Sequence, residues 1–171
     1  KDDQRTTTKK DPVLAIHFIA PVKGKISQKF DPNEHAGLDV VTPKNKTVHS
    51  CLSGTVIYSG YSQKDGHILI IQHSNDFTSV YKHNQSRLKK TGDKVRTGDP
   101  IAIVGNSGDN STGPHLHFEI RDTKTEVALN PLLFGFPVAD HVPPKISDVK
   151  AYFFDDNNEF LLHLQRLLLL G

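Results

Sequence analysis

Short strand-like runs separated by turn residues fill the middle of this chain, and they constrain its fold more than any other feature. Gly, Asp, Asn and Pro interrupt the sequence repeatedly, as in residues 52–54 (Leu-Ser-Gly) and 91–93 (Thr-Gly-Asp). Short strands at such close spacing are typical of an all-β sandwich or barrel with mainly antiparallel pairing. The predicted strands cover residues 26–30, 37–42, 47–51, 55–61, 68–73, 79–83, 94–95, 101–104 and 116–121.

The length of 171 residues suits one domain with a short appendage. No long helical period precedes residue 150, so we predict an all-β fold with little helix. We expect residues 1–12 to form a flexible tail, residues 13–136 the main domain, and residues 137–171 a C-terminal appendage. In the appendage, residues 146–154 are a predicted strand. Residues 160–171 are predicted to be a short terminal helix or the cut edge of a longer protein.

The composition narrows the possible functions. The net charge is only +2, which gives no basis for nucleic-acid binding. The single cysteine, Cys51, has apolar neighbours and no partner for a disulfide, so we expect a buried thiol. The chain lacks methionine and opens without an apolar segment, so we expect a processed or excised chain. Its terminal apolar run is too short for the ~20 residues that span a bilayer, so no transmembrane segment is predicted.

Two of the ten histidines share one face of a predicted strand. Because strand side chains alternate between faces, His115 and His117 point the same way. Leu116, Phe118 and Ile120 point the other way, into a core. Two imidazoles on one face of a strand are suited to binding a metal ion.

A histidine and an aspartate earlier in the chain complete a possible metal site. His35 and Asp39 are four residues apart, so they share a face on an extended strand, and Gly37 between them lets the chain curve. Zn²⁺ takes imidazole and carboxylate ligands, and three protein ligands with one open position mark a catalytic site. The third ligand would be His115 or His117.

A further histidine, His83, follows Tyr81 by two residues in a predicted strand. The two side chains have the same strand parity, and we expect His83 to reach the rim of the metal site. A zinc hydrolase needs a group that takes a proton from water, and histidine is suited to this near neutral pH. Any one of these histidines alone is more often structural; their joint occurrence carries the prediction.

Two glycine-rich segments suggest other functions, which the sequence does not support. Residues 92–105 share a turn pattern with lipoyl and biotinyl carrier domains, but the nearest hairpin tip has no lysine to carry the cofactor. Residues 105–114 lack Gly-Lys-Ser/Thr and lead into a strand, so no helix N-terminus is available for a phosphate. We expect this loop to let a substrate backbone approach closely.

The motifs together resemble those of peptidase family M23, the zinc metallopeptidases of the lysostaphin and LytM type. The resemblance is carried by residues 35–39 (His-Ala-Gly-Leu-Asp), 81–83 (Tyr-Lys-His) and 111–119 (Ser-Thr-Gly-Pro-His-Leu-His-Phe-Glu). These motifs stand in the expected order, and the similarity covers about residues 17–134. The end of the chain resembles longer, Bacteroidota-type relatives.

The resemblance implies a site and a fold. His35, Asp39 and His117 match the zinc ligands of the family, for one Zn²⁺ per chain, and His83 and His115 match its two catalytic histidines. The implied fold is a LytM-like β-sheet groove related to the barrel-sandwich hybrid. His73 also matches a common family position, where it would line the groove or support a metal ligand, or else have a purely structural role.

The implied function is that of a zinc metalloendopeptidase. It would hydrolyse peptide bonds in peptidoglycan stem peptides or cross-links by zinc-activated water, with peptidoglycan peptides as its partners. The alternative is a non-catalytic LytM-like module that activates cell-wall amidases. Either would work in the cell envelope, periplasmic or extracellular, after removal of a signal or anchor. The sequence does not indicate the oligomeric state or which bond is cleaved.

Overall fold

The computed structural model describes residues 18–43, 46–74, 76–134, 151–154 and 160–163. Contacts divide the chain into two units, one with the described residues up to Phe134 and the other with the two strands after residue 150. The predicted tail at residues 1–12 and most of the predicted appendage lie outside the described residues.

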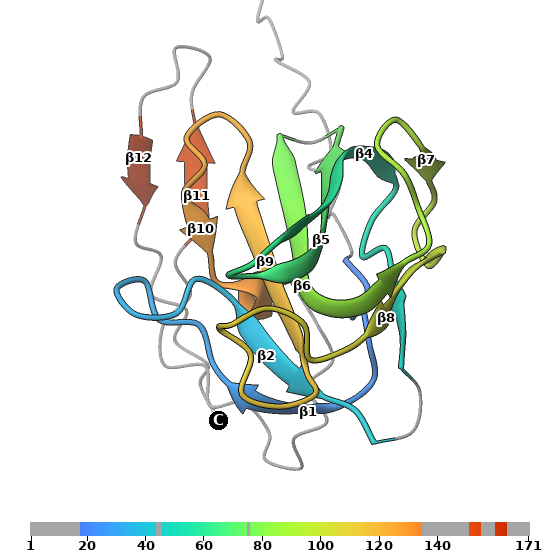
Figure 1. Ribbon diagram of the computed structural model, residues 1–171. Coiled ribbons are helices and arrows are strands. Elements are labelled where there is room, and N and C mark those ends of the chain that lie inside the picture. Colours follow the sequence, from blue (N-terminus) through green and yellow to red (C-terminus); the bar gives the residue numbers. More distant parts are fainter. Residues whose placement is uncertain (1–17, 44–45, 75, 135–150, 155–159, 164–171) are drawn as a thin grey trace, which may run out of the picture. The chain divides into compact units, whose positions relative to one another are not determined.

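The first unit is a ten-stranded sheet in which every pairing is antiparallel. Its main path is β1-β2-β9-β6-β5-β4-β7, with β10 beside β9 and the β3-β8 pair joined to β6 (Figure 1). The strands are β1 (Lys25–Gln28), β2 (Leu38–Val41), β3 (Thr47–His49), β4 (Gly54–Ser62), β5 (Gly66–His73), β6 (Phe77–Arg87), β7 (Lys94–Val95), β8 (Pro100–Val104), β9 (Leu116–Asp122) and β10 (Ala128–Leu129).

Helix is nearly absent from the described residues, where a short 3-10 turn, η1 (Pro131–Phe134), follows β10. The prediction of a mainly antiparallel, all-β fold is confirmed. Every strand predicted between residues 26 and 121 is present, most of them with shifted ends. No helix in the described part of the chain is both long and apolar enough to cross a membrane.

One face of the sheet carries the hydrophobic core. Leu116, Phe118 and Ile120 of β9 are all buried in it, as the alternation of that strand predicts. Across the β6–β9 pair, Tyr81 lies opposite Phe118, and their rings are in contact. Cys51 is also fully buried there, and burial raises the pKa of its thiol to about 11. This face fixes β9, so its other face presents polar side chains at set positions.

The second unit is a two-stranded antiparallel hairpin of β11 (Ala151–Phe154) and β12 (Phe160–His163). The strand predicted at residues 146–154 is thus present in its described part. The helix predicted for residues 160–171 is wrong over residues 160–163. A short apolar run is compatible with either a strand or a buried helix. Residues 160–163 form a strand because they pair with β11.

Candidate metal centre

The pairing of β2 with β9 brings two of the predicted metal-binding residues together. Asp39 lies directly opposite His117 in the register of these strands, and Asp39 Oδ1 is 2.8 Å from His117 Nδ1. His35 stands before β2, where a backbone bridge to Asp31 fixes the turn. His35 Nε2 is 3.2 Å from both Asp39 Oδ1 and His117 Nδ1. Three potential ligand atoms therefore meet at one point.

In the rings of His35 and His117, the nitrogen that points away from the cluster forms a hydrogen bond, which determines which nitrogen carries the proton and which has a lone pair. His35 Nδ1 donates to the carbonyl oxygen of Lys29 at 2.9 Å, so Nε2 of the neutral ring has a lone pair. His117 Nε2 donates to Glu119 Oε1 at 3.0 Å, so its Nδ1 has the lone pair. Asp39 Oδ1 adds a carboxylate lone pair. All three converging atoms are thus electron-pair donors.

This donor set fits a zinc ion. A tetrahedral Zn²⁺ at ~2.1 Å from its ligands would hold the ligand atoms ~3.4 Å apart. The two separations of 3.2 Å that involve His35 are close to that value, and the Asp39–His117 separation of 2.8 Å is somewhat shorter. Lone pairs facing one another at such distances repel unless a proton or a cation lies between them. The site therefore has the composition and spacing of three ligands around one metal ion.

The charges in the site also favour a cation. Burial raises the pKa of Asp39, but the close contact with His117 and the neighbouring imidazoles lower it by more, so the carboxyl stays ionised. Burial lowers the pKa of His117, but its contacts with the carboxylates of Asp39 and Glu119 raise it by more. Two carboxylates thus create a negative potential at His117 that attracts positive charge.

Gly37 allows β2 to approach β9 closely. A Cβ atom at this position would lie 2.4 Å from the carbonyl oxygen of Phe118 and 3.0 Å from Glu119 Cγ. Gly37 does not have a positive φ. Glycine is therefore required here because a side chain would not fit, and not because the chain must curve, as the sequence analysis predicted. A larger residue would push Asp39 away from His117.

The two predicted catalytic histidines lie beside these ligand atoms. His115 Nε2 is 3.6 Å from Asp39 Oδ2, while its Nδ1 donates to the carbonyl oxygen of Gly113 at 2.7 Å. The ring centroids of His83 and His115 are 5.0 Å apart, and those of His83 and His117 are 5.9 Å apart. All five residues singled out from the sequence therefore form one cluster.

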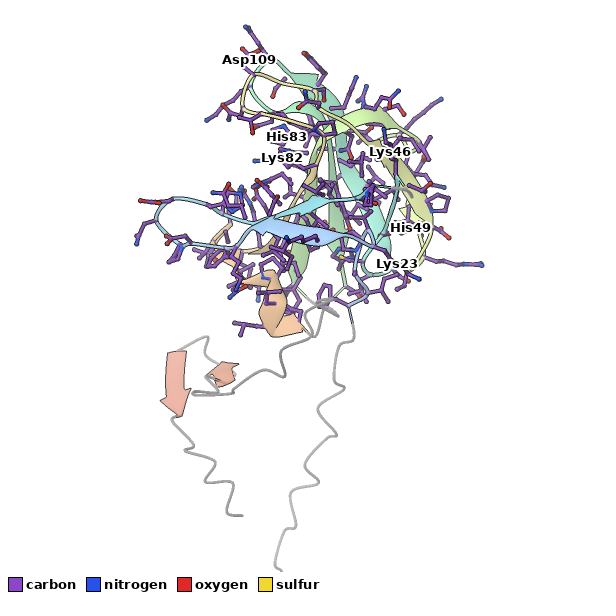
Figure 2. All side chains as sticks on the ribbon, turned by 90° about the horizontal axis from the view of Figure 1, so that it is seen from below. Lys23, Lys46, His49, Lys82, His83 and Asp109 are labelled. Carbon is purple, nitrogen blue, oxygen red and sulfur yellow. The ribbon has the colours of Figure 1, made fainter. Side chains whose placement is uncertain are left out.

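His83 reaches this cluster in a way that the sequence did not predict. Tyr81, with the same strand parity, is buried in the core on the other face of the sheet. His83 has a φ of 60°, and a register shift lies next to it in the β5–β6 pairing. This bulge turns His83 to the side of its neighbour Lys82, and both are labelled in Figure 2. The parity argument for His83 is therefore wrong, although the residue lies where it was expected.

The sequence analysis missed Glu119, whose side chain is fully buried beside His117. In addition to His117, its carboxylate contacts Lys82 Nζ at 2.8 Å and accepts a hydrogen bond from Arg121 Nε at 2.6 Å. Burial raises the pKa of Glu119, but His117 and Lys82 lower it to about 2 in total. The signal was present, because positions 115, 117 and 119 share one strand face.

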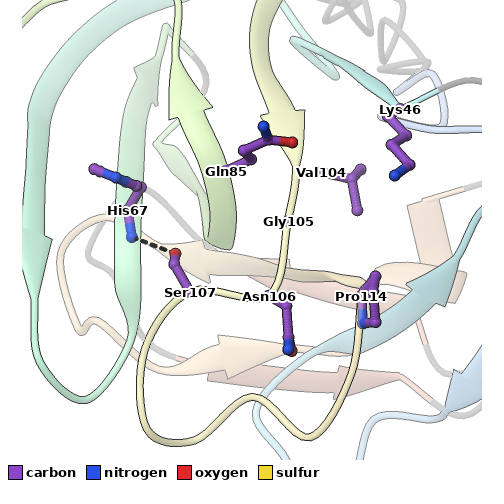
Figure 3. Close-up of a pocket in the computed structure, with 8 residues that line it drawn as sticks. All are labelled: Lys46, His67, Gln85, Val104, Gly105, Asn106, Ser107 and Pro114. Atoms are coloured by element: carbon purple, nitrogen blue, oxygen red, sulfur yellow. Dashed lines mark hydrogen bonds between the residues drawn. The ribbon is translucent and has the colours of Figure 1, made fainter.

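Ser107 was also missed. Its carbonyl oxygen accepts a hydrogen bond from His83 Nδ1 at 3.0 Å, and its hydroxyl accepts one from the His67 backbone, drawn in Figure 3. Ser107 also lines a pocket of about 400 Å³ that contains none of the five clustered residues. The other lining residues are Lys46, His67, Gln85, Val104, Gly105, Asn106 and Pro114.

His73 is a structural residue. It is buried, its Nε2 is 2.8 Å from Ser79 Oγ, and its Nδ1 is 3.0 Å from the carbonyl oxygen of Ser53. Its ring also contacts Phe18 in the core. Of the two possibilities left open by the sequence, the structural one is therefore correct.

Comparison with known proteins agrees with these motifs. The model of Peptidase family M23 matches residues 33–131. Peptidoglycan DD-endopeptidase ShyC of Vibrio cholerae is 39% identical over 101 residues, which cover 59% of this chain and 22% of the relative. Murein hydrolase activator NlpD of Salmonella dublin is 33% identical over 132 residues, covering 75% of this chain and 33% of the relative. Similar proteins therefore include both an enzyme and an activator.

A solved structure is similar in fold as well as in sequence. A zinc containing peptidase from Vibrio cholerae superposes with a TM-score of 0.62 and 28% identity, over 71% of this chain and 40% of that one. The chain spans about a third of the length of the first curated relatives that it matches. The similarity therefore concerns one domain of these longer proteins.

Proposed function

Because the chain belongs to peptidase family M23, we propose that it is a zinc metalloendopeptidase that hydrolyses peptide bonds in peptidoglycan. The observation that carries this proposal is the convergence of three electron-pair donors, His35 Nε2, Asp39 Oδ1 and His117 Nδ1, next to two further imidazoles. Residues 13–136 would form the peptidase domain.

His35, Asp39 and His117 would hold one zinc ion. When bound, zinc polarises a carbonyl group and lowers the pKa of water. Three protein ligands leave a coordination position open for substrate or water. Since Asp39 and His117 come from paired strands, their positions are fixed before any ligand arrives, and little reorganisation is needed for catalysis.

His83 and His115 would transfer protons. Each donates its Nδ1 proton to a backbone carbonyl oxygen, so the Nε2 atom of each neutral ring has a lone pair that can accept a proton from water. Burial lowers the pKa of His83, more than the hydrogen bond to Ser107 raises it, which keeps this ring neutral near pH 7. Once protonated, either imidazole can stabilise an oxyanion or return the proton to the leaving amine.

The substrate class follows from the relatives. A relative that covers 59% of this chain is named a peptidoglycan DD-endopeptidase, and we propose peptide bonds in stem peptides or cross-links as the target here. A protein with this substrate works in the cell envelope, in the periplasm or outside the cell.

The competing function is that of a non-catalytic activator of cell-wall amidases. It is favoured by one specific observation, the similarity to a murein hydrolase activator over 75% of the chain. Against it stands the complete set of five residues, because a module that only binds another enzyme needs neither a metal site nor two imidazoles with free Nε2 atoms.

The two functions are distinguished by incubating the zinc-loaded protein with purified peptidoglycan, with and without an added amidase. If the protein is a peptidase, it releases soluble fragments without the amidase, and mass spectrometry of these products shows a cleaved peptide bond. An activator releases nothing alone and increases the release of intact stem peptides by the amidase. A His115→Ala variant serves as the control, because it should lose peptidase activity without losing the surface that would bind an amidase.

A further inference from the structure

The loop between β8 and β9, residues 105–115, forms hydrogen bonds with the Nδ1 atoms of both proposed catalytic rings. The carbonyl oxygen of Ser107 accepts the Nδ1 proton of His83 at 3.0 Å, and that of Gly113 accepts the Nδ1 proton of His115 at 2.7 Å. Because carbonyl groups only accept hydrogen bonds, the proton of each neutral ring is on Nδ1, and Nε2 has a lone pair. The loop thus contacts both imidazoles at the same ring atom, Nδ1.

Ser107 and His83 contact each other twice. Besides the ring contact, the backbone N–H of Ser107 donates to the carbonyl oxygen of His83 at 3.3 Å. His83 has a φ of 60°, an unfavourable value for a residue with a Cβ atom, which persists only where the surroundings hold it. The backbone N–H of His83 is held by the carbonyl oxygen of Asp65 at 3.1 Å. Ser107 therefore restrains both the backbone and the ring of a strained residue.

The hydroxyl of Ser107 connects the loop to two strands at once. It donates to the carbonyl oxygen of Asn84 in β6 at 2.6 Å and accepts from the backbone N–H of His67 in β5 at 2.9 Å. Figure 3 shows the second of these contacts and the loop passing beneath the ends of the strands. A Cβ atom on Gly66 would lie 2.1 Å from the hydroxyl oxygen, so the fit at this point is close.

The same loop is attached to the β4–β5 turn by its backbone. The N–H groups of Asp109 and Asn110 donate to the carbonyl oxygens of Gln63 and Lys64 at 2.8 and 3.0 Å. The position of the Ser107 carbonyl group is thus set by these backbone hydrogen bonds together with the two hydrogen bonds of the Ser107 hydroxyl.

We propose that Ser107 is a positioning residue for the hydrolysis, which holds the loop against β5 and β6 so that its carbonyl group orients His83. This inference rests on the proposed function. Ser107 itself touches neither the three proposed metal ligands nor, on this proposal, the substrate. Its removal should therefore affect the chemical step and leave metal binding intact, a separation that a purely structural role would not produce.

The test compares a Ser107→Ala variant of the whole chain with the wild type and with Thr112→Ala, a matched change at an exposed position of the same loop. A cross-linked muropeptide dimer is the substrate, and kcat, KM, zinc affinity and thermal midpoint are measured. We expect kcat of Ser107→Ala to fall by about tenfold to a hundredfold, with KM and zinc Kd within about twofold of the wild type. Thr112→Ala should match the wild type.

An unchanged kcat in Ser107→Ala would overturn the inference, as would a parallel loss of zinc affinity and thermal stability. If the variant does not fold, ¹⁵N NMR of the imidazole nitrogens in the zinc-loaded wild type still decides. The inference requires a proton on Nδ1 of His83 and none on Nε2, and the opposite tautomer would overturn it. Failure of the wild type to cleave any peptidoglycan would instead reject the proposed function.

Discussion

Asp39 and His117 are 78 residues apart in the chain, yet they face each other as register partners in β2 and β9, with Oδ1 and Nδ1 2.8 Å apart. The distance between these two proposed ligands is therefore set by the hydrogen-bonded ladder of a sheet. Because a one-residue shift of register would turn either side chain to the other face, the same pairing that buries Leu38 and Phe118 also fixes the site.

The close approach of β2 and β9 depends on Gly37. We expect Gly37→Ala to destabilise the protein by about 1–3 kcal/mol and to weaken zinc binding, because the added methyl group meets the Phe118 carbonyl group. Gly113→Ala is the control, since a Cβ atom there meets nothing within 4 Å. Chemical denaturation measures the effect, and equal stability of the two variants would contradict this role for Gly37.

The carboxylate of Glu119 should control metal affinity through His117. Glu119→Gln removes the charge that accepts the Nε2 proton, and we expect zinc affinity to fall by about tenfold to a hundredfold. Glu126→Gln, a change at an exposed position just beyond β9, should leave the affinity unchanged. Competition with a chelator of known zinc affinity gives both values. Wild-type affinity in Glu119→Gln would show that His117 binds metal without this support.

Substitutions of the proposed catalytic histidines should reduce catalysis without loss of zinc, whereas substitution of a proposed metal ligand should remove both. We expect His83→Ala and His115→Ala to keep about one zinc per chain and to lose hydrolysis by a factor of about 10² to 10⁴. His35→Ala should lose zinc and activity together. Metal analysis of the purified variants, beside rates on a cross-linked muropeptide, checks this division. Loss of zinc in His115→Ala would instead make it a ligand.

Stability should decrease on acidification because of His73. Burial lowers the pKa of His73 from 6.5, and the hydrogen bond to Ser53 only partly offsets this. Below about pH 6.5 the unfolded chain therefore binds a proton that the native state does not, so the free energy of unfolding falls as the pH falls through this range. Above it, His73 is neutral in both states and contributes no pH dependence.

Urea unfolding with a chelator present, between about pH 7.5 and about pH 5.5, measures this effect without the metal site. His73→Gln should be less stable near neutral pH and should show a flatter pH dependence than the wild type. Parallel curves for the two proteins would mean that His73 does not cause the loss.

The sequence predicted those features that depend on local alternation. The strand of Leu116, Phe118 and Ile120 has its apolar residues in the core, and the His115–His117 pair lies on the opposite face, as expected. Alternation could not decide between these two histidines as the third ligand. The structure favours His117 for the proposed metal site, because only His117 of the two lies opposite Asp39 and only its ring contacts Glu119.

Features that depend on contacts between distant segments were not predictable. The bulge that turns His83 out of the core arises from the pairing of β5 with β6 and from the loop of Ser107, and neither leaves a periodic signal. Residues 160–163 pair with β11, although the composition of this apolar segment suits a helix equally well. In each case the conformation of the segment is determined by its contacts with a segment that is distant in the sequence.

A zinc titration of protein stripped with a chelator, followed by hydrolysis of a cross-linked muropeptide, decides whether this chain is itself a zinc peptidase. The rate should be near zero without metal, should rise in proportion to added zinc, and should level off at about one zinc per chain. Full activity in the stripped protein, or no hydrolysis at any ratio of zinc to protein, would contradict the proposed function.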